Sequence, residues 1–132
     1  MHRTRLGLHP ARDPRPRRGL DDLIRRRVLD AGALYVGQSA GAIVAGANIR
    51  TAFWKGWDDP TAGGDLEDAR EWSAERLCSM GLVRDRVFFP HYDGGAAHDE
   101  LIERNRGACG GSQVVCLSDD GAQAFVSGIE EE

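Results

Sequence analysis

The spacing of apolar residues after Gly19 predicts a helix at the start of the regular part of the chain. In GLDDLIRRRVLDAG (19–32), four aliphatic residues recur at helical spacing and fall on one stripe. They are Leu20, Leu23, Ile24 and Val28. Two aspartates in the first turn complement the helix dipole, and the closing glycine is typical of a helix end. We therefore expect a helix that ends at Gly32.

Short apolar runs and runs of small residues alternate along the rest of the chain. ALYV, RVFF, VVCL and AQAFVSG have the length and composition of strands. AGAIVAGA has the composition of a helix whose small residues can pack close to a sheet. We expect strands at 33–36, 86–89, 114–117 and 122–128, and helices at 40–47, 66–80 and 99–106. Strands that alternate with helices indicate an α/β fold with an open, mostly parallel sheet flanked by helices.

Composition divides the chain at residue 18. Residues 1–18 hold six arginines and three prolines but one acid, and they offer little apolar surface to bury. We expect 1–18 to be a disordered tail and 19–132 to be a single α/β domain. A transit peptide is also rich in arginine, but it should be rich in serine too, and this segment contains none.

The overall charge and the cysteines narrow the possible partners and compartment. The net charge of −4 argues against attraction to nucleic acid or to an anionic membrane. No apolar run approaches the ~20 residues needed to span a bilayer. The three cysteines form neither a disulfide framework nor a zinc knuckle in their spacing. A cytoplasmic location is therefore the expectation.

One motif in the chain carries a specific chemical meaning. GQSAG (37–41) matches G-x-S-x-G at the junction of an expected strand and an expected helix, which is the context of a nucleophile elbow. A serine on such a turn projects its hydroxyl clear of the sheet, and glycines beside it leave room for the turn. The N–H groups of the following helix face the developing oxyanion. Ser39 is therefore a candidate nucleophile, with Gly37, Ala40 and Gly41 as elbow and oxyanion residues; the alternative is a serine that only caps a helix.

A nucleophilic serine needs a base and an acid, and strand ends supply candidates for both. His91 directly follows the RVFFP strand, and Asp119 follows the VVCL strand. Parallel sheets collect their active sites at the carboxyl ends of strands. Asp58, in the tryptophan-bearing loop, is a second candidate for the acid that orients the imidazole. His91 as an ordinary loop histidine remains an alternative.

Several segments together resemble a known family. YVGQSAGAIVAGANIRT, WDDP, FFPHYDG and LSDDGAQAFV, in that order, resemble the aspartyl dipeptidase (dipeptidase E) family of serine peptidases, whose fold is similar to that of class I glutamine amidotransferases. The resemblance implies that Ser39 is the nucleophile, that His91 is the general base and that Asp58 completes the triad, with Asp119 as the alternative acid. It also implies hydrolysis of dipeptides with an N-terminal aspartate, and no cofactor.

The resemblance has departures that bear on activity. Glutamine precedes the serine where well-known members have tryptophan, and WKGW lengthens the loop before Asp58. The strands and the glycine-rich oxyanion segment that precede the elbow in the family are replaced by the arginine–proline tail. We therefore expect residues 19–132 to be the C-terminal part of an N-terminally truncated peptidase-like domain that self-associates or is only marginally folded, with weak or no peptidase activity. A noncatalytic remnant that acts as an interaction module is the alternative function.

Two further groups of residues are weaker candidates. Arg104 and Arg106, on the helix after His91, have the charge to receive a substrate carboxylate, although exposed arginines are common on helices. His91, Asp93 and His98 would be the donors of a metal site, but their spacing fits no defined metal motif.

Overall fold

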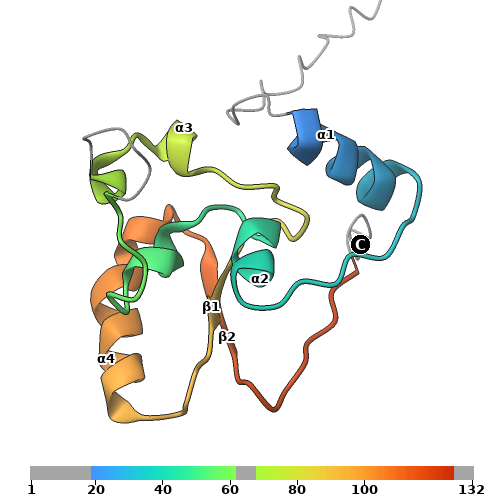
Figure 1. Ribbon diagram of the computed structural model, residues 1–132. Helices are drawn as coiled ribbons and strands as arrows, with labels where there is room; N and C mark the ends of the chain where they lie inside the picture. The colour runs from blue at the N-terminus through green and yellow to red at the C-terminus, as the bar shows by residue number, and fades with distance from the viewer. Residues whose placement is uncertain (1–18, 62–67, 127–132) are drawn as a thin grey trace, which may run out of the picture.

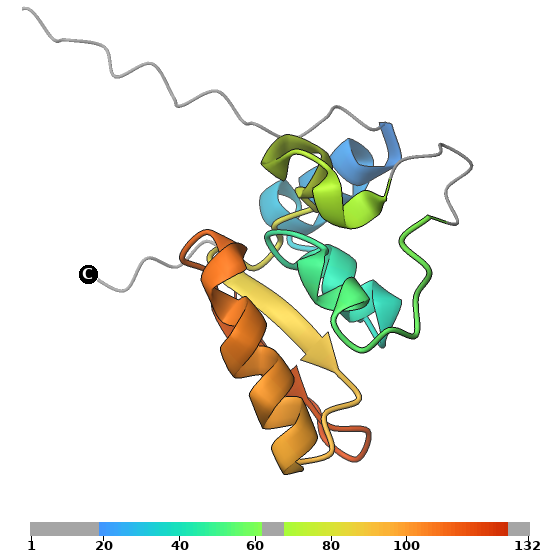
Figure 2. The same cartoon turned by 90° about the vertical axis from the view of Figure 1, so that its left-hand side faces the viewer.

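The structure is a computed structural model that describes residues 19–61 and 68–126, and it has an α/β architecture (Figure 1). Two parallel strands, β1 (Arg86–Pro90) and β2 (Gln113–Leu117), form the sheet of the described residues. Helix α4 (Ala96–Asn105) connects them and lies on one side of the pair, while α2 (Ala40–Ala45) lies on the other (Figure 2). The expected α/β class is confirmed, and the expected tail at 1–18 lies outside the described residues.

Strand β1 is buried on both faces, as parallel strands usually are. Val87 and Phe89 are fully buried, and Phe88 is almost so. Phe88 belongs to the core cluster on the α2 side, which also contains Ala42, Ala45, Met80 and Leu82. Phe89 faces the other way, and its ring contacts those of Trp54 and His98. The strand therefore holds the two layers of the domain together.

The outer edge of β1 is closed by side chains and backbone of residues 47–55 rather than by another strand. Every second carbonyl of β1 points away from β2, and each one accepts a hydrogen bond from this segment. The pairs are Ala47 N–H with Arg86 O at 2.8 Å, Thr51 Oγ1 with Phe88 O at 2.6 Å, and Lys55 Nζ with Pro90 O. Successive donors are four residues apart, whereas successive acceptors are two residues apart. The donor segment keeps pace with the extended strand because it is more compact and includes a 3-10 turn at Arg50–Phe53. These bonds satisfy carbonyls that an open edge would leave available to another chain.

Most of the regular elements agree with the pattern of the sequence. Helix α1 (Gly19–Arg25) continues as a π-helical turn over Arg26–Asp30, and the chain leaves it at Gly32, whose φ is 72°. The helices expected at 40–47 and 99–106 are confirmed as α2 and α4, and the strands expected at 86–89 and 114–117 as β1 and β2. Across the described ranges, every helix is too short or too polar to cross a bilayer.

The strand expected at 33–36 does not form. These residues are irregular, and Leu34 and Val36 are 88% and 84% exposed. A strand needs a neighbour for its backbone N–H and C=O groups, and the outer edge of β1 is already closed by residues 47–55. The apolar run alone was therefore misleading. Self-association through such exposed apolar residues stays a prediction.

Two other expected elements are also wrong in the described residues. In place of one helix over 66–80, the structure has a 3-10 turn (Ala69–Glu71) and the short α3 (Ala74–Leu77), while residues 66–67 lie outside the description. Ser73 is extended and accepts a hydrogen bond from the N–H of Arg76, so it begins a new helix instead of continuing one. Residues 122–126 of the expected strand at 122–128 are irregular as well. There the amide of Gln123 bonds Cys116 O, and the ring of Phe125 packs on that of Phe88.

The closed edge of β1 makes a prediction about stability. Thr51 is 2% exposed, so Thr51→Val removes the hydroxyl and leaves the Phe88 carbonyl buried without a partner. We expect the free energy of unfolding to fall by about 1–3 kcal/mol, measured by urea denaturation. Thr61→Val, at an exposed threonine, is the matched control and should change it by less than about 0.5 kcal/mol. Equal midpoints for the two variants would contradict this account of the edge.

Candidate active site

Ser39 lies at the turn that leads into α2, in a backbone conformation that residues other than glycine rarely adopt. Its φ is 52° and its ψ is −118°. Its carbonyl accepts the N–H groups of Ala42 and Ile43, so its backbone starts the helix. Its side chain, however, makes no cap hydrogen bond to the helix. The hydroxyl is instead 2.9 Å from Nε2 of His91. Ser39 therefore does not serve only as a helix cap.

The two glycines of the motif differ in how strictly the turn requires them. A Cβ on Gly37 would lie 2.5 Å from the carbonyl oxygen of Gly41 and 2.8 Å from the ring of Tyr35. A Cβ on Gly41 would make only an ordinary contact, 3.7 Å from the Tyr35 hydroxyl. That hydroxyl donates to the Gly41 carbonyl at 2.7 Å and ties the approach segment to the first turn of α2. The tight turn therefore depends mainly on Gly37.

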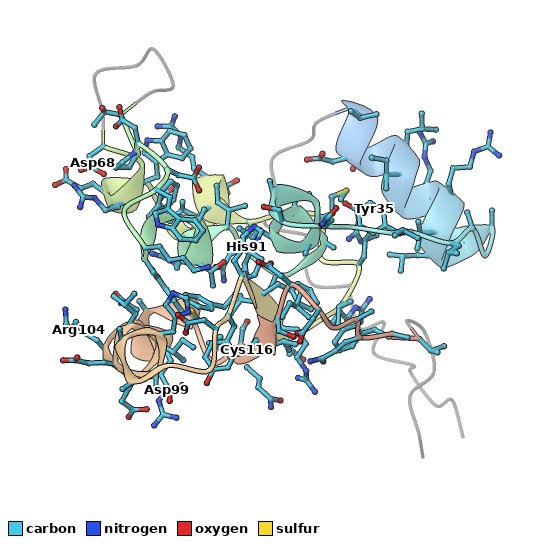
Figure 3. All side chains as sticks on the ribbon, turned by 60° about the horizontal axis from the view of Figure 1, so that its bottom comes forward. Tyr35, Asp68, His91, Asp99, Arg104 and Cys116 are labelled. Carbon is cyan, nitrogen blue, oxygen red and sulfur yellow. The ribbon has the colours of Figure 1, made fainter. Side chains whose placement is uncertain are left out.

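The end of β1 directs His91 toward the serine. His91 directly follows Pro90, the last residue of the strand, and its φ of 56° turns the chain sharply out of the sheet. The imidazole lies between Ser39 on one side and Asp119 on the other, with a side chain that is 32% exposed. The Trp57 ring lies beside it, with ring centroids 5.8 Å apart. Figure 3 shows His91 in the middle of the molecule, between the turn before α2 and the strand pair.

Asp119, and not Asp58, is the carboxylate next to this imidazole. Oδ1 of Asp119 is 2.5 Å from Nδ1 of His91, and the Asp119 side chain is 77% exposed. The parallel register pairs Pro90 with Leu117, so the residues that follow β1 and β2 emerge side by side. Asp58 lies exposed in the tryptophan loop and makes no hydrogen bond to the His91 ring among the described residues. The structure therefore joins Ser39, His91 and Asp119 and leaves out the acid expected first.

One backbone N–H at the start of α2 is available to an oxyanion. Gly41 N–H bonds Gln38 O and Ala42 N–H bonds Ser39 O, so both are used within the first turn. The Ala40 N–H follows Ser39 directly, and it donates to no acceptor in the part of the chain that the structure describes. This is the N–H that a nucleophile elbow directs at the oxyanion.

Arg104 and Arg106 are not brought to this site. Each forms an ion pair along its own helix face, Arg104 with Glu100 at 3.1 Å and Arg106 with Glu103 at 2.9 Å. Their side chains are more than 60% exposed. Figure 3 shows Arg104 on the outer side of α4, pointing away from His91. Their geometry is that of a solvated helix face.

The three donors of the weaker metal hypothesis are not brought together, because His91 faces away from the other two. His98 Nδ1 is 2.9 Å from Asp93 Oδ1, and the His98 ring packs on Phe89 and Tyr92. His91 instead faces Ser39 and Asp119. Among the described residues, no three His, Cys, Asp or Glu side chains are arranged to hold a metal ion.

Lys55 is a residue near the site that the sequence analysis missed. Its ammonium donates to the carbonyl of Pro90, directly before His91, and it lies over the ring of Trp57. A signal was present in the sequence, because Lys55 is the single lysine of a chain with 17 basic residues.

The fold and this site define the class of the protein. A serine in a strained turn before a helix, a histidine and a carboxylate at neighbouring strand ends are the arrangement of an α/β serine hydrolase. The family model of peptidase family S51 matches residues 15–129, and the chain belongs to this family of serine peptidases. The resemblance seen in the sequence is thereby confirmed. No curated protein and no solved structure matches the chain.

Tyr92 fixes the segment after His91. Its N–H donates to Leu117 O at 2.9 Å, and its hydroxyl donates to Oδ1 of Asp99, on α4, at 2.5 Å. The hydrogen bond to the Asp99 carboxylate raises the pKa of Tyr92 from 10.0 to about 12. Because this pKa is raised in the folded state, the bond stabilises the fold below pH 10 and is lost as the pH rises from there to about 12.

This pair can be tested by titration. The chain has two tyrosines, and burial raises the pKa of Tyr35 as well. In Tyr35→Phe, the tyrosinate absorbance should therefore report Tyr92 alone, with a midpoint near 12. Adding Asp99→Asn removes the charged acceptor and should return the midpoint toward 10.0. A midpoint near 10.0 in Tyr35→Phe itself would show that the bond is absent in solution.

Proposed function

We propose that the chain is a serine-type peptidase that works through an acyl-enzyme, with Ser39 as nucleophile, His91 as general base and Asp119 as the acid of the triad. The observation that carries the proposal is the continuous series of contacts from Ser39 Oγ to His91 Nε2 at 2.9 Å and from His91 Nδ1 to Asp119 Oδ1 at 2.5 Å. Both distances allow hydrogen bonds, and the order of the groups is the one that nucleophilic catalysis requires.

In the acylation step, Ser39 Oγ attacks the carbonyl carbon of the scissile peptide bond while His91 Nε2 takes the hydroxyl proton. Asp119 holds the Nδ1–H of the imidazole, which selects the tautomer with a free Nε2 and stabilises the imidazolium that forms. The imidazolium then gives its proton to the leaving amine. A water molecule hydrolyses the acyl-enzyme by the same transfers in the second half of the reaction.

The carbonyl oxygen becomes negatively charged in both halves of the reaction. The Ala40 N–H is the donor that the described residues supply for it, since the next two N–H groups are used within the turn. Loss of one oxyanion donor typically costs ~10²–10³ in rate. The rate that the chain reaches therefore depends strongly on whether a second donor completes this site.

The substrate class in this proposal follows the family resemblance. Short peptides, and in particular dipeptides with an N-terminal aspartate, are the substrates that it implies, without a cofactor. The exposure of the Asp119 side chain and of Ala40 supports a site that small peptides reach from solvent. Arg104 and Arg106 pair along their own helix and do not contact the triad, so in this proposal another group receives the substrate carboxylate.

Labelling with a fluorophosphonate tests the proposal directly. Such a probe reacts with a serine that a neighbouring base activates, so mass spectrometry should find the adduct on Ser39. Ser39→Ala and His91→Ala should each remove nearly all labelling and all hydrolysis of Asp-Xaa dipeptides, because the residues of a triad act as a unit. A folded protein that the probe leaves unlabelled would favour the noncatalytic remnant.

The roles of the two aspartates can be separated by parallel substitutions. Asp119→Asn keeps the shape of the side chain but removes the charge that stabilises the imidazolium, and we expect turnover to fall by ~10⁴. Asp58→Asn is the matched control, and because Asp58 lies exposed outside the series we expect less than a tenfold loss. A larger loss for Asp58→Asn than for Asp119→Asn would return the acid of the triad to the tryptophan loop.

A further inference from the structure

Lys55 contacts three groups that lie near His91, the candidate base. Its ammonium donates to the Pro90 carbonyl and lies 4.2 Å from the centroid of the Phe89 ring and 4.6 Å from that of Trp57. An ammonium is a compact charge that fits between two aromatic faces and one carbonyl. In a chain whose other 16 basic residues are arginines, the single lysine occupies this position.

Two of these contacts reach His91 from different directions. The Pro90 carbonyl belongs to the peptide bond that enters His91, whose φ of 56° is a strained conformation for a residue other than glycine. Such a conformation persists only when its surroundings hold it. Trp57, the second contact, places its ring 5.8 Å from the imidazole. Lys55 therefore contacts both the backbone just before His91 and the Trp57 ring, which lies beside the imidazole of His91.

The charges around Lys55 support the same arrangement. Burial lowers the pKa of Lys55, while the nearby carboxylates of Asp119 and Asp93 and the Cys116 thiol act to raise it. The ammonium thus has lost part of its hydration and is compensated by protein groups, one of which is the triad carboxylate. A side chain held in this way is suited to fix a neighbour in place.

We propose that Lys55 is a positioning residue for His91: it holds the Pro90 carbonyl, and with it the strained turn of the chain, and it places Trp57 against the imidazole. This inference rests on the proposed function, in which His91 is the base. Lys55 itself touches neither the nucleophile nor the acid, and its effect on the reaction passes through the orientation of the imidazole.

Substitution of Lys55 tests this role against a structural one. Lys55→Met keeps the length of the side chain but removes its hydrogen bond and charge, and we expect kcat and the rate of fluorophosphonate labelling to fall ~10–100-fold with KM within a factor of about two. Lys55→Arg restores a donor and a cation that stacks on aromatic rings, and should recover most of the rate. Arg84→Met, which removes an exposed cation before β1, is the control and should behave as the unsubstituted chain does.

Three kinetic outcomes would overturn the proposal. One is an unchanged labelling rate in Lys55→Met. Another is a rise in KM with unchanged kcat, which would make Lys55 a group that binds the substrate carboxylate. The third is an equal loss in Lys55→Met and Lys55→Arg, which would assign the effect to packing alone. If Lys55→Met does not fold, Lys55→Gln gives the same test, because it removes the positive charge while keeping a polar side chain.

Proton NMR separates this inference from the proposed peptidase activity. A hydrogen bond from His91 Nδ1 to a carboxylate should give a far-downfield imidazole proton, which is assigned by its absence in His91→Ala. We expect this signal to shift or broaden away in Lys55→Met and to remain in Arg84→Met. If the unsubstituted protein neither labels nor hydrolyses peptides, the proposed function fails. An unchanged His91 signal in Lys55→Met would overturn the positioning role whatever the activity.

Discussion

The parallel pairing of β1 with β2 is the constraint on which the candidate active site depends. The register places Pro90 opposite Leu117, so both strands end at the same level. His91 and the loop that contains Asp119 therefore follow at the same edge of the sheet. Tyr92 extends the pairing by one further hydrogen bond to Leu117 O. The serine reaches the same edge because α2 packs closely on β1: a Cβ on Gly46 would lie 2.9 Å from the carbonyl oxygen of Arg86. Three segments that are distant in the sequence thus meet through one ladder and one close helix contact.

Elements that the sequence predicted well are those whose local pattern agrees with their tertiary surroundings. In RVFF, Val87, Phe88 and Phe89 form an apolar run, and in β1 this run is buried on both faces. AGAIVAGA has small residues, and α2 uses them to approach the strand. The runs at 33–36 and 122–128 have a similar composition, but in the described residues they pair with no other strand. A local run of residues does not show whether a partner for its backbone is available. The helix expected at 66–80 failed because Ser73 caps a new helix rather than continuing an old one.

Part of the site was also predictable, because two of its residues lie in local patterns that the fold preserves. The serine motif and the histidine after a strand depend on local sequence and on a general rule for parallel sheets, and the structure joins them. Two acids remained open because the choice between Asp58 and Asp119 depends on where a loop lies, and the register of the strands decides this rather than the spacing along the chain. Lys55 was missed because its role depends on a tertiary contact. It donates to the Pro90 carbonyl, the last of the three β1 carbonyls that residues 47–55 bind.

The irregular approach to Ser39 has a consequence for how the nucleophile is presented. His91 follows β1 directly and Asp119 lies two residues after β2, whereas residues 33–36 belong to no ladder. The serine is held by the packing of α2 and by the hydrogen bond from the Tyr35 hydroxyl to the Gly41 carbonyl. The effective molarity of the hydroxyl at the imidazole therefore depends on a few local contacts, and such contacts open with less free energy than a whole domain. We therefore expect the nucleophile to have a local opening equilibrium of its own, separate from that of the sheet that the base and the acid adjoin.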